Sequence, residues 1–164
     1  MSSNNHRFLF LTFAFLLFNS LLFGQKDDSF PDLRKPKNRV YVIAHRGAHQ
    51  GIPENSLQAY QKAIDLGCDF VEIDIRTTKD GKFVSVHNAS IDNYTEGKTG
   101  SVKSLTLAEL KAIDIGSKTG NKWKGTQIPT FEEILQLCRG KIGIYLDLKD
   151  AAIPELMAII RKYD

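Results

Sequence analysis

The sequence is poor in cysteine and has no excess of charge of either sign, and each shortage excludes a class of protein. Only two cysteines occur in 164 residues, too few for a disulfide-rich miniprotein. Lys and Arg number 22 against 19 Asp and Glu, and no basic run exceeds two adjacent residues, so we expect no nucleic-acid partner. With 42% hydrophobic and 25% charged residues, the chain has the composition of a globular protein.

No acidic residue occurs before Asp27, and much of this first segment is apolar. Arg7 precedes an apolar stretch, Phe8–Phe23, which the small residue Gly24 follows. This order is typical of a secretory signal peptide, so we predict one over residues 1–24 and a secreted or periplasmic protein. An uncleaved membrane anchor is the alternative, although the stretch is shorter than the ~20 residues of a usual spanning helix.

Residues 25–39 are polar, contain two prolines and show no apolar period, which predicts a solvated spacer. We assign residues 40–164 to a folded domain. Cys68 and Cys138 fall inside it, each just before a predicted strand. Export would permit a disulfide between them, but such positions favour buried free thiols.

Strand and helix patterns alternate along this domain. Strands are predicted at Val40–Gly47, Asp69–Thr77, Lys82–Asn88 and Gly143–Lys149. Helical signals are an apolar face over Glu54–Leu66, capping boxes at Thr106…Glu109 and Thr130…Glu133, and Pro154 at the start of a last helix. Strands separated by helices predict βαβ units and a parallel sheet.

Alternation within the strands separates packing from chemistry. One side of the strands carries, in chain order, Tyr41, Ile43 and His45; Glu72, Asp74 and Arg76; Ser85 and His87; Tyr145, Asp147 and Lys149. In a (β/α)8 barrel the helix-facing side is apolar and catalytic groups gather at the C-terminal ends of the strands. A half-exposed sheet alternates in the same way. Because such a barrel typically needs about 250 residues, we predict an α/β fold of TIM-barrel type, truncated to about its first four strands.

Glu72 and Asp74 lie on the same side of one strand, about 6.6 Å apart along it. Carboxylates this close repel each other unless a cation lies between them. Oxygen ligands favour Mg²⁺ or Ca²⁺ over zinc, and Asp147 offers a third carboxylate from another strand. We therefore predict a divalent-cation site. The alternative is salt bridging of these carboxylates to nearby cations, namely Arg46, Arg76 and Lys149.

His45 and His87 end the first and third predicted strands, which we expect to flank the carboxylate strand. Two strand spacings of about 4.8 Å would separate the histidines by roughly 10 Å, enough for a phosphate between them. Displacement at phosphorus uses a base on the attacking side and an acid on the leaving side, and imidazole titrates near neutral pH. We predict such a pair, with Arg46 as a phosphate contact and His49 as a surface residue.

Several of these residues lie in motifs that resemble the glycerophosphodiester phosphodiesterase family. The similar strings are Ala44-His45-Arg46-Gly47 with Pro53-Glu54-Asn55, Val71–Ile75, Val84…His87, Gln127–Leu135 and Asp147-Leu148-Lys149. The resemblance covers about residues 40–150 and implies a TIM-barrel hydrolase that uses a divalent cation. Its reaction would cleave glycerophosphodiesters to glycerol 3-phosphate and an alcohol, through attack of a glycerol hydroxyl on phosphorus and opening of a cyclic phosphate by water.

The resemblance also implies roles for individual residues. His45 and His87 would be the acid/base pair, Glu72, Asp74 and Asp147 would hold the metal with Glu54 close to it, and Arg46 and Lys149 would contact the phosphate. The family usually has Glu at position 147, and His-Asp where this chain has His87-Asn88, followed here by Asn93-Tyr94-Thr95. We expect the second difference to alter the loop near the substrate.

The resemblance reaches the N-terminal half of the family barrel. We expect a small glycerophosphodiester as substrate, and a membrane contact only if the N-terminal segment is uncleaved. An open half-barrel would expose strand edges, so a missing C-terminal half or self-association is expected to cover them. Two other functions stay open: a catalytically silent remnant that binds phosphate ligands, and a phospholipase D-like enzyme that acts on lysolipids.

Overall fold

The computed structural model describes residues 35–37 and 39–163, so the predicted signal peptide lies outside the described residues. The strands are β1 (Ile43–Ala44), β2 (Phe70–Thr77), β3 (Phe83–Ser85) and β4 (Gly143–Leu148). The helices are α2 (Leu57–Asp65), α3 (Leu107–Lys111), α4 (Phe131–Cys138) and α5 (Ile153–Ile160), with 3-10 turns η1 (Val102–Ser104) and η2 (Asn121–Trp123). In the described part of the chain, no helix is both long enough and apolar enough to cross a membrane.

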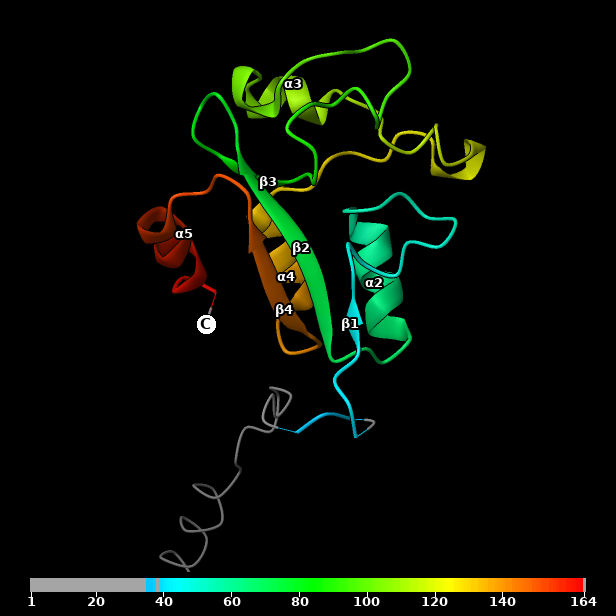
Figure 1. Ribbon diagram of the computed structural model, residues 1–164, viewed down its shortest axis with the longest axis vertical. Helices are drawn as coiled ribbons and strands as arrows, with labels where there is room; N and C mark the ends of the chain where they lie inside the picture. Colours follow the sequence, from blue (N-terminus) through cyan, green and yellow to red (C-terminus); the bar gives the residue numbers. More distant parts are fainter. Residues whose placement is uncertain (1–34, 38, 164) are drawn as a thin grey trace, which may run out of the picture. The chain divides into compact units, whose positions relative to one another are not determined.

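The central strand of the sheet is β2, which has partners on both edges (Figure 1). β1 pairs with its beginning in parallel, with Ala44 opposite Val71. β4 also pairs in parallel, from Phe70 opposite Gly143 to Ile75 opposite Leu148. These parallel pairs confirm the α/β character that the alternating pattern predicts.

The predicted parallel sheet is confirmed for β1, β2 and β4 but does not include β3. This strand runs antiparallel to the end of β2, with Ile75 opposite Ser85 and Thr77 opposite Phe83. The link between the two strands is only a tight turn, whereas parallel pairing needs a crossover of a dozen or more residues. Because Ile75 also pairs with Leu148, β3 and β4 lie on opposite edges of β2. β1, β2 and β4 are therefore parallel to one another. In a barrel of this type, β4 rather than β3 is the parallel strand that follows β2.

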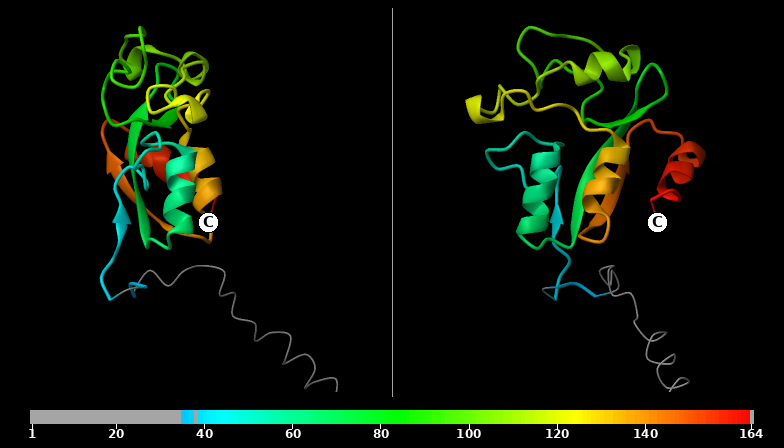
Figure 2. Two further views of the ribbon diagram at one scale, coloured as in Figure 1. Left: turned by 90° about the vertical axis from the view of Figure 1, so that its right-hand side faces the viewer. Right: turned by 180° about the vertical axis from the view of Figure 1, so that it is seen from behind.

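Helices cover one face of this sheet, and Figure 2 shows α2 and α4 side by side there. Val71, Ile73 and Ile75 of β2 are fully buried in the core that these helices share with the sheet, together with Tyr60 and Phe131. This burial confirms the predicted apolar side of β2. Each such side chain contributes about 1.5–3 kcal/mol to folding relative to an exposed one.

Local signals set the helix ends largely as predicted. Both capping boxes form, at the starts of α3 and α4, and Pro154 lies in the first turn of α5. Helix α2 begins later than predicted, at Leu57, because the Ser56 side chain caps it. Glu54 and Asn55 consequently belong to the loop between β1 and α2, where they are free to contribute to a site.

A second apolar cluster stands beyond the C-terminal end of β2, in the segment that contains α3 (Figure 1). Val84 of β3 and Val86 pack there with Leu110, Ile113 and Ile128, and all five side chains are buried. This cluster gives residues 86–128 a folded core of their own. It thereby holds their polar side chains close to the end of β2.

Large apolar side chains are exposed on the outer strands. Ile43 of β1 is 46% exposed and Tyr145 of β4 is 55% exposed, while Ile153 at the start of α5 reaches 60%. Within the described residues, β1 and β4 each pair with β2 alone. The expected exposure of strand edges is therefore present, because closing a barrel would require a further strand on each.

Cys68 and Cys138 are free, buried thiols, which confirms the prediction of free thiols over a disulfide. Burial raises the pKa of Cys138 to about 12, and only the thiolate reacts. At pH 8 its thiolate fraction is roughly 10³-fold below that of a thiol with an ordinary pKa of about 8.5. We expect Ellman's reagent to label Cys138 very slowly in the native protein, and to titrate two thiols per chain in urea. Fewer than two in urea would indicate a disulfide.

Candidate active site

Three carboxylates meet on the face of the sheet opposite the helices. Glu72 and Asp74 come from β2, and the strand register places Asp147 of β4 directly opposite Asp74. One ligand oxygen from each of the three lies within 4.8 Å of the others. Glu72 and Asp74 are buried, whereas the side chain of Asp147 is 43% exposed. The cluster therefore has one solvent-facing side.

The donor set of this cluster fits a hard divalent cation. All three ligands are carboxylates, which Mg²⁺ and Ca²⁺ prefer. Oδ1 of Asp74 is buried, and its contact with Nζ of Lys149 at 3.1 Å is an ion pair without hydrogen-bond geometry, so this oxygen already faces a cation. Burial raises the pKa of Glu72, and the charge of Asp74 adds to this effect, although the backbone N–H of Arg46 opposes it. The negative charges on Glu72 and Asp74 would be relieved by a cation.

Lys149 reaches the same oxygens from the end of β4. Its Nζ lies 2.6 Å from Oδ2 of Asp147 and 3.1 Å from Oδ1 of Asp74. The hydrogen bond to Asp147 raises the pKa of Lys149, so the side chain stays charged. Arg46 adds a longer contact, 3.7 Å from its Nε to Oδ2 of Asp74. Two of the three salt-bridge partners considered from the sequence therefore lie at the cluster, and Arg76 does not.

A buried hydrogen-bond network orients Asp74. Nδ2 of Asn55 donates to Oδ2 of Asp74 at 2.8 Å. Oδ1 of Asn55 accepts from the Tyr60 hydroxyl at 2.8 Å and from the Ser85 hydroxyl at 3.0 Å. Burial raises the pKa of Tyr60 well above its usual range, which keeps the hydroxyl protonated as a donor. The network thus fixes one face of a candidate metal ligand.

The sequence pattern indicates these supporting residues only in part. Ser85 appeared on the polar side of its strand, and Asn55 appeared in a motif without a role. Tyr60 fits the apolar face of α2 by its spacing, which carries no signal that its hydroxyl reaches Asn55. Asn55 has a φ of +50°, a left-handed conformation that Asn adopts more readily than most residues.

The loop after β1 places Arg46 beside the carboxylates. The Arg46 backbone N–H donates to Oε2 of Glu72 at 2.7 Å, and its Nη1 donates to both oxygens of Glu54, at 3.1 and 3.2 Å. Glu54 therefore pairs with Arg46 and is not one of the three clustered carboxylates. Gly47 permits this loop, because its φ is +83° and a Cβ would lie 2.7 Å from Cβ of Ala59.

The two histidines lie in the loops that follow β1 and β3. His45 is exposed and His87 is partly buried. Nδ1 of His87 lies 2.8 Å from Oδ1 of Asn88. Because an amide oxygen only accepts, Nδ1 carries the proton and Nε2 is the acceptor of the neutral ring. His49 lies next to the first histidine, with 6.4 Å between the centres of the His45 and His49 rings.

The predicted positions of the histidines on opposite sides of the carboxylate strand are wrong. β1 and β3 both lie on the edge of β2 that β4 leaves free. The predicted separation of His45 and His87 by two strand spacings, about 10 Å, therefore does not follow from the arrangement of the strands. Arg76 fixes the second histidine instead: its Nε and Nη2 donate to the His87 carbonyl at 3.1 and 2.7 Å, and its Nη1 donates to Asp150 at 3.1 Å.

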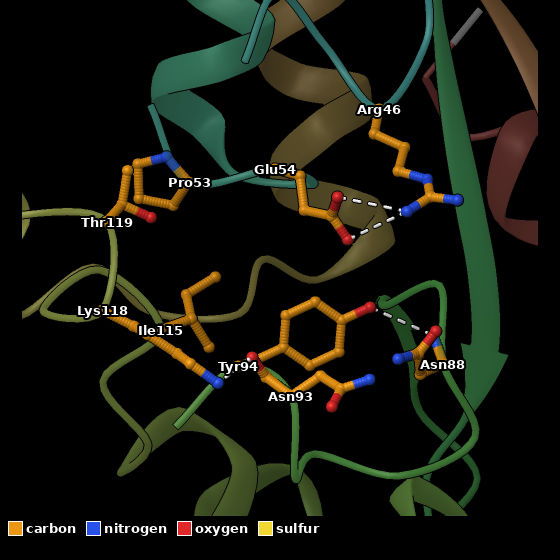
Figure 3. Close-up of a pocket in the computed structure, with 9 residues that line it drawn as sticks. All are labelled: Arg46, Pro53, Glu54, Asn88, Asn93, Tyr94, Ile115, Lys118 and Thr119. Atoms are coloured by element: carbon orange, nitrogen blue, oxygen red, sulfur yellow. Dashed lines mark hydrogen bonds and ion pairs between the residues drawn. The ribbon is translucent and has the colours of Figure 1, made fainter. Parts of the chain in front are cut away.

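A polar pocket of about 330 Å³ opens beside Arg46 (Figure 3). It is lined by Arg46, Pro53, Glu54, Asn88, Asn93, Tyr94, Ile115, Lys118 and Thr119. Figure 3 shows the Glu54 carboxylate turned toward Arg46 and the Tyr94 hydroxyl turned toward Asn88, whose backbone N–H donates to it at 3.1 Å. The loop that the sequence predicts to differ from the family thus forms one wall of this pocket.

Comparisons with known proteins place these features in one family. The model of the glycerophosphoryl diester phosphodiesterase family matches residues 45–155. A glycerophosphodiester phosphodiesterase of Caldanaerobacter subterraneus is 43% identical over 103 residues, which make up 63% of this chain and 42% of that protein.

Solved structures agree. The glycerophosphodiester phosphodiesterase of Agrobacterium tumefaciens superposes with a TM-score of 0.72 at 30% identity, over 76% of this chain and 53% of its own. A phosphodiesterase of Oleispira antarctica, solved in complex with the product sn-glycerol-3-phosphate, superposes with a TM-score of 0.71 at 31% identity, with the same coverage.

This chain therefore spans about half the length of these relatives. The matched structures confirm the predicted fold class, an α/β sheet that corresponds to part of a TIM barrel. The family match covers most of the described domain and includes the carboxylate cluster and the loop of Arg46. The chain therefore belongs to the glycerophosphoryl diester phosphodiesterase family.

Proposed function

We propose that this protein cleaves glycerophosphodiesters to glycerol 3-phosphate and an alcohol, and that it does so with a bound divalent cation. The observation that carries the proposal is the cluster of Glu72, Asp74 and Asp147 beside the cationic side chains of Arg46 and Lys149. Negative oxygens for a cation and positive groups for a phosphate thus lie together in a member of this family.

In this proposal Glu72, Asp74 and Asp147 hold Mg²⁺ or Ca²⁺. A bound divalent cation would neutralise the charge that develops on the phosphoryl oxygens. Arg46 and Lys149 bind the phosphate, because both carry charged donors at the edge of the cluster and the Arg46 guanidinium is suited to two oxygens at once. Glu54 holds the Arg46 side chain in place through its two hydrogen bonds.

His45 and His87 move the protons. Attack by a hydroxyl of the glycerol unit on phosphorus requires a base, and departure of the alcohol requires an acid. His87 is suited to the exchange, because Asn88 holds its ring at Nδ1 and Arg76 holds its backbone. Nε2 is left to accept or return a proton. We also propose export of the protein, on the composition of residues 1–24 alone.

Hydrolysis of glycerophosphocholine by the purified protein tests the proposal. We expect release of glycerol 3-phosphate in Mg²⁺ or Ca²⁺, its fall to the uncatalysed background in EDTA, and its return when the cation is restored. Glycerol 3-phosphate binding is measured on the same samples by calorimetry. Binding without turnover would contradict the enzyme proposal and support the phosphate-binding alternative. Faster cleavage of lysophosphatidylcholine would support the lysolipid enzyme.

A further inference from the structure

We infer that the pocket beside Arg46 binds the head-group alcohol of the substrate, and that it prefers a polyhydroxylated alcohol such as inositol to a quaternary ammonium such as choline. The inference rests on the proposed function, because it takes the phosphate to lie at Arg46. The pocket begins at that side chain, so an alcohol esterified to the phosphate would extend into it.

Side chains that form hydrogen bonds dominate the lining. The segment after β3 contributes Asn88, Asn93, Tyr94, Lys118 and Thr119, whereas the apolar lining residues are Ile115 and Pro53. An alcohol with several hydroxyl groups matches such a wall, because each hydroxyl can both donate and accept. A few placed polar groups of this kind are what orient small ligands in pockets.

The charges of the pocket also oppose a cationic head group. Arg46 and Glu54 pair with each other at 3.1 Å and so largely cancel. Nζ of Lys118 donates to the backbone oxygen of Asn93 at 2.7 Å, and over residues 39–163 no carboxylate lies within ion-pair distance of it. The pocket therefore keeps one positive charge.

Quaternary ammonium groups are bound by cages of aromatic faces or by free carboxylates. The lining of this pocket has one aromatic ring, that of Tyr94, and one carboxylate, that of Glu54. The carboxylate is already bound to Arg46. The lining of the pocket therefore has neither an aromatic cage nor a free carboxylate for a choline group.

The size of the pocket favours the head group over the glycerol unit that all these diesters share. A volume of about 330 Å³ corresponds to roughly ten waters at about 30 Å³ each. A three-carbon glycerol unit would leave much of that space to solvent. A ring alcohol would fill more of it and reach Lys118 and Thr119 on the far wall.

The test compares three ligands: glycerophosphoinositol, glycerophosphocholine and glycerol 3-phosphate. Dissociation constants are measured by calorimetry in EDTA and, where Mg²⁺ supports turnover, kcat/KM is measured for the two diesters in competition. We expect the inositol diester to be preferred about tenfold. Lys118→Glu should remove or reverse that preference and leave glycerol 3-phosphate binding nearly unchanged. Lys103→Glu makes the same charge change on an exposed lysine outside the pocket and should keep the preference.

Equal affinity of the wild-type protein for the two diesters would overturn the inference, and so would an unchanged preference in Lys118→Glu. An equal loss for all three ligands would show that Lys118 acts on the shared glycerol phosphate and would overturn the assignment to the head group. If glycerol 3-phosphate binds and the diesters are not distinguished, the inference alone fails. If none of the three binds in EDTA and glycerol 3-phosphate also fails to bind in Mg²⁺ or Ca²⁺, the proposed function fails with it.

Discussion

Asp74→Asn is expected to weaken Mg²⁺ or Ca²⁺ binding at least about a hundredfold and to reduce hydrolysis to the background rate. Asp74 is fully buried, and its Oδ1 faces the ammonium of Lys149 rather than a neutral donor. Asp74 also lies directly beside Asp147 on the neighbouring strand β4, so it is central to the cluster. An amide would keep the shape of the side chain but remove its charge. Calorimetric titration with the cation measures the effect directly.

The same substitution should leave the protein folded. Asp74 faces Lys149 at 3.1 Å and Arg46 at 3.7 Å, but each of these cations keeps another carboxylate, Asp147 or Glu54. The bond from Asn55 is retained by the amide oxygen. We therefore expect a loss of about 1–3 kcal/mol, below the 3–5 kcal/mol, roughly, of a buried charge left without a partner. Thermal unfolding in EDTA checks this.

Asp65→Asn is the matched control for this prediction. Asp65 ends α2, is exposed, and accepts a hydrogen bond from Gln61 at 2.8 Å. Its substitution removes the same charge away from the cluster and should leave cation binding unchanged. Wild-type cation affinity in a folded Asp74→Asn protein would contradict the metal site. The salt-bridge interpretation, with Lys149 and Arg46 as the partners of these carboxylates, would then describe the cluster.

His87→Ala is expected to lower kcat by about 10²–10⁴-fold while the protein still binds the divalent cation, because general acid–base catalysis is typically worth that factor. His87 is not a member of the carboxylate cluster, so its loss should affect proton transfer and leave the cation site intact. His45→Ala should give a loss of the same order. Steady-state kinetics on glycerophosphocholine, combined with cation titration, separates the two effects.

His49→Ala serves as the control for both histidine variants. The ring of His49 lies 6.4 Å from that of His45, yet the sequence predicts only a surface role for it. Its substitution should leave kcat close to that of the wild type. Activity near the wild-type level in His45→Ala or in His87→Ala would overturn the acid/base assignment. A large loss in His49→Ala would show that the wrong histidine of the pair had been chosen.

Patterns of short range predicted a large part of this molecule. The alternation in β2 correctly separates buried Val71, Ile73 and Ile75 from the carboxylates, because successive side chains of a strand always point to opposite faces. Both capping boxes form where Ser/Thr and Glu have the right spacing, since such bonds close within one turn of helix. These features depend only on neighbours along the chain.

The positions of the histidines and the support of Asp74 could not be predicted in this way. A period of two is the same in parallel and antiparallel strands, so the alternation in β3 did not reveal that it turns back on β2. The local signal for this hairpin is the Asp80-Gly81 turn between the two strands. Likewise, the spacing of Tyr60 fits an apolar helix face, and only packing brings its hydroxyl to Asn55. Arg76 shares a strand face with Asp74, yet the hairpin turns the His87 carbonyl toward it.

The sequence by itself determined which side of the strands the carboxylates Glu72, Asp74 and Asp147 occupy, and the family to which the chain belongs. Only the tertiary structure decided which of them meet. It places Asp147 opposite Asp74 by making β4 the neighbour of β2, sets Lys149 among the carboxylates, and builds a pocket beside Arg46 from a distant segment. Strand pairing joins residues far apart in the chain, and the free energy that selects one pairing comes from the burial of the whole core, which no local pattern records.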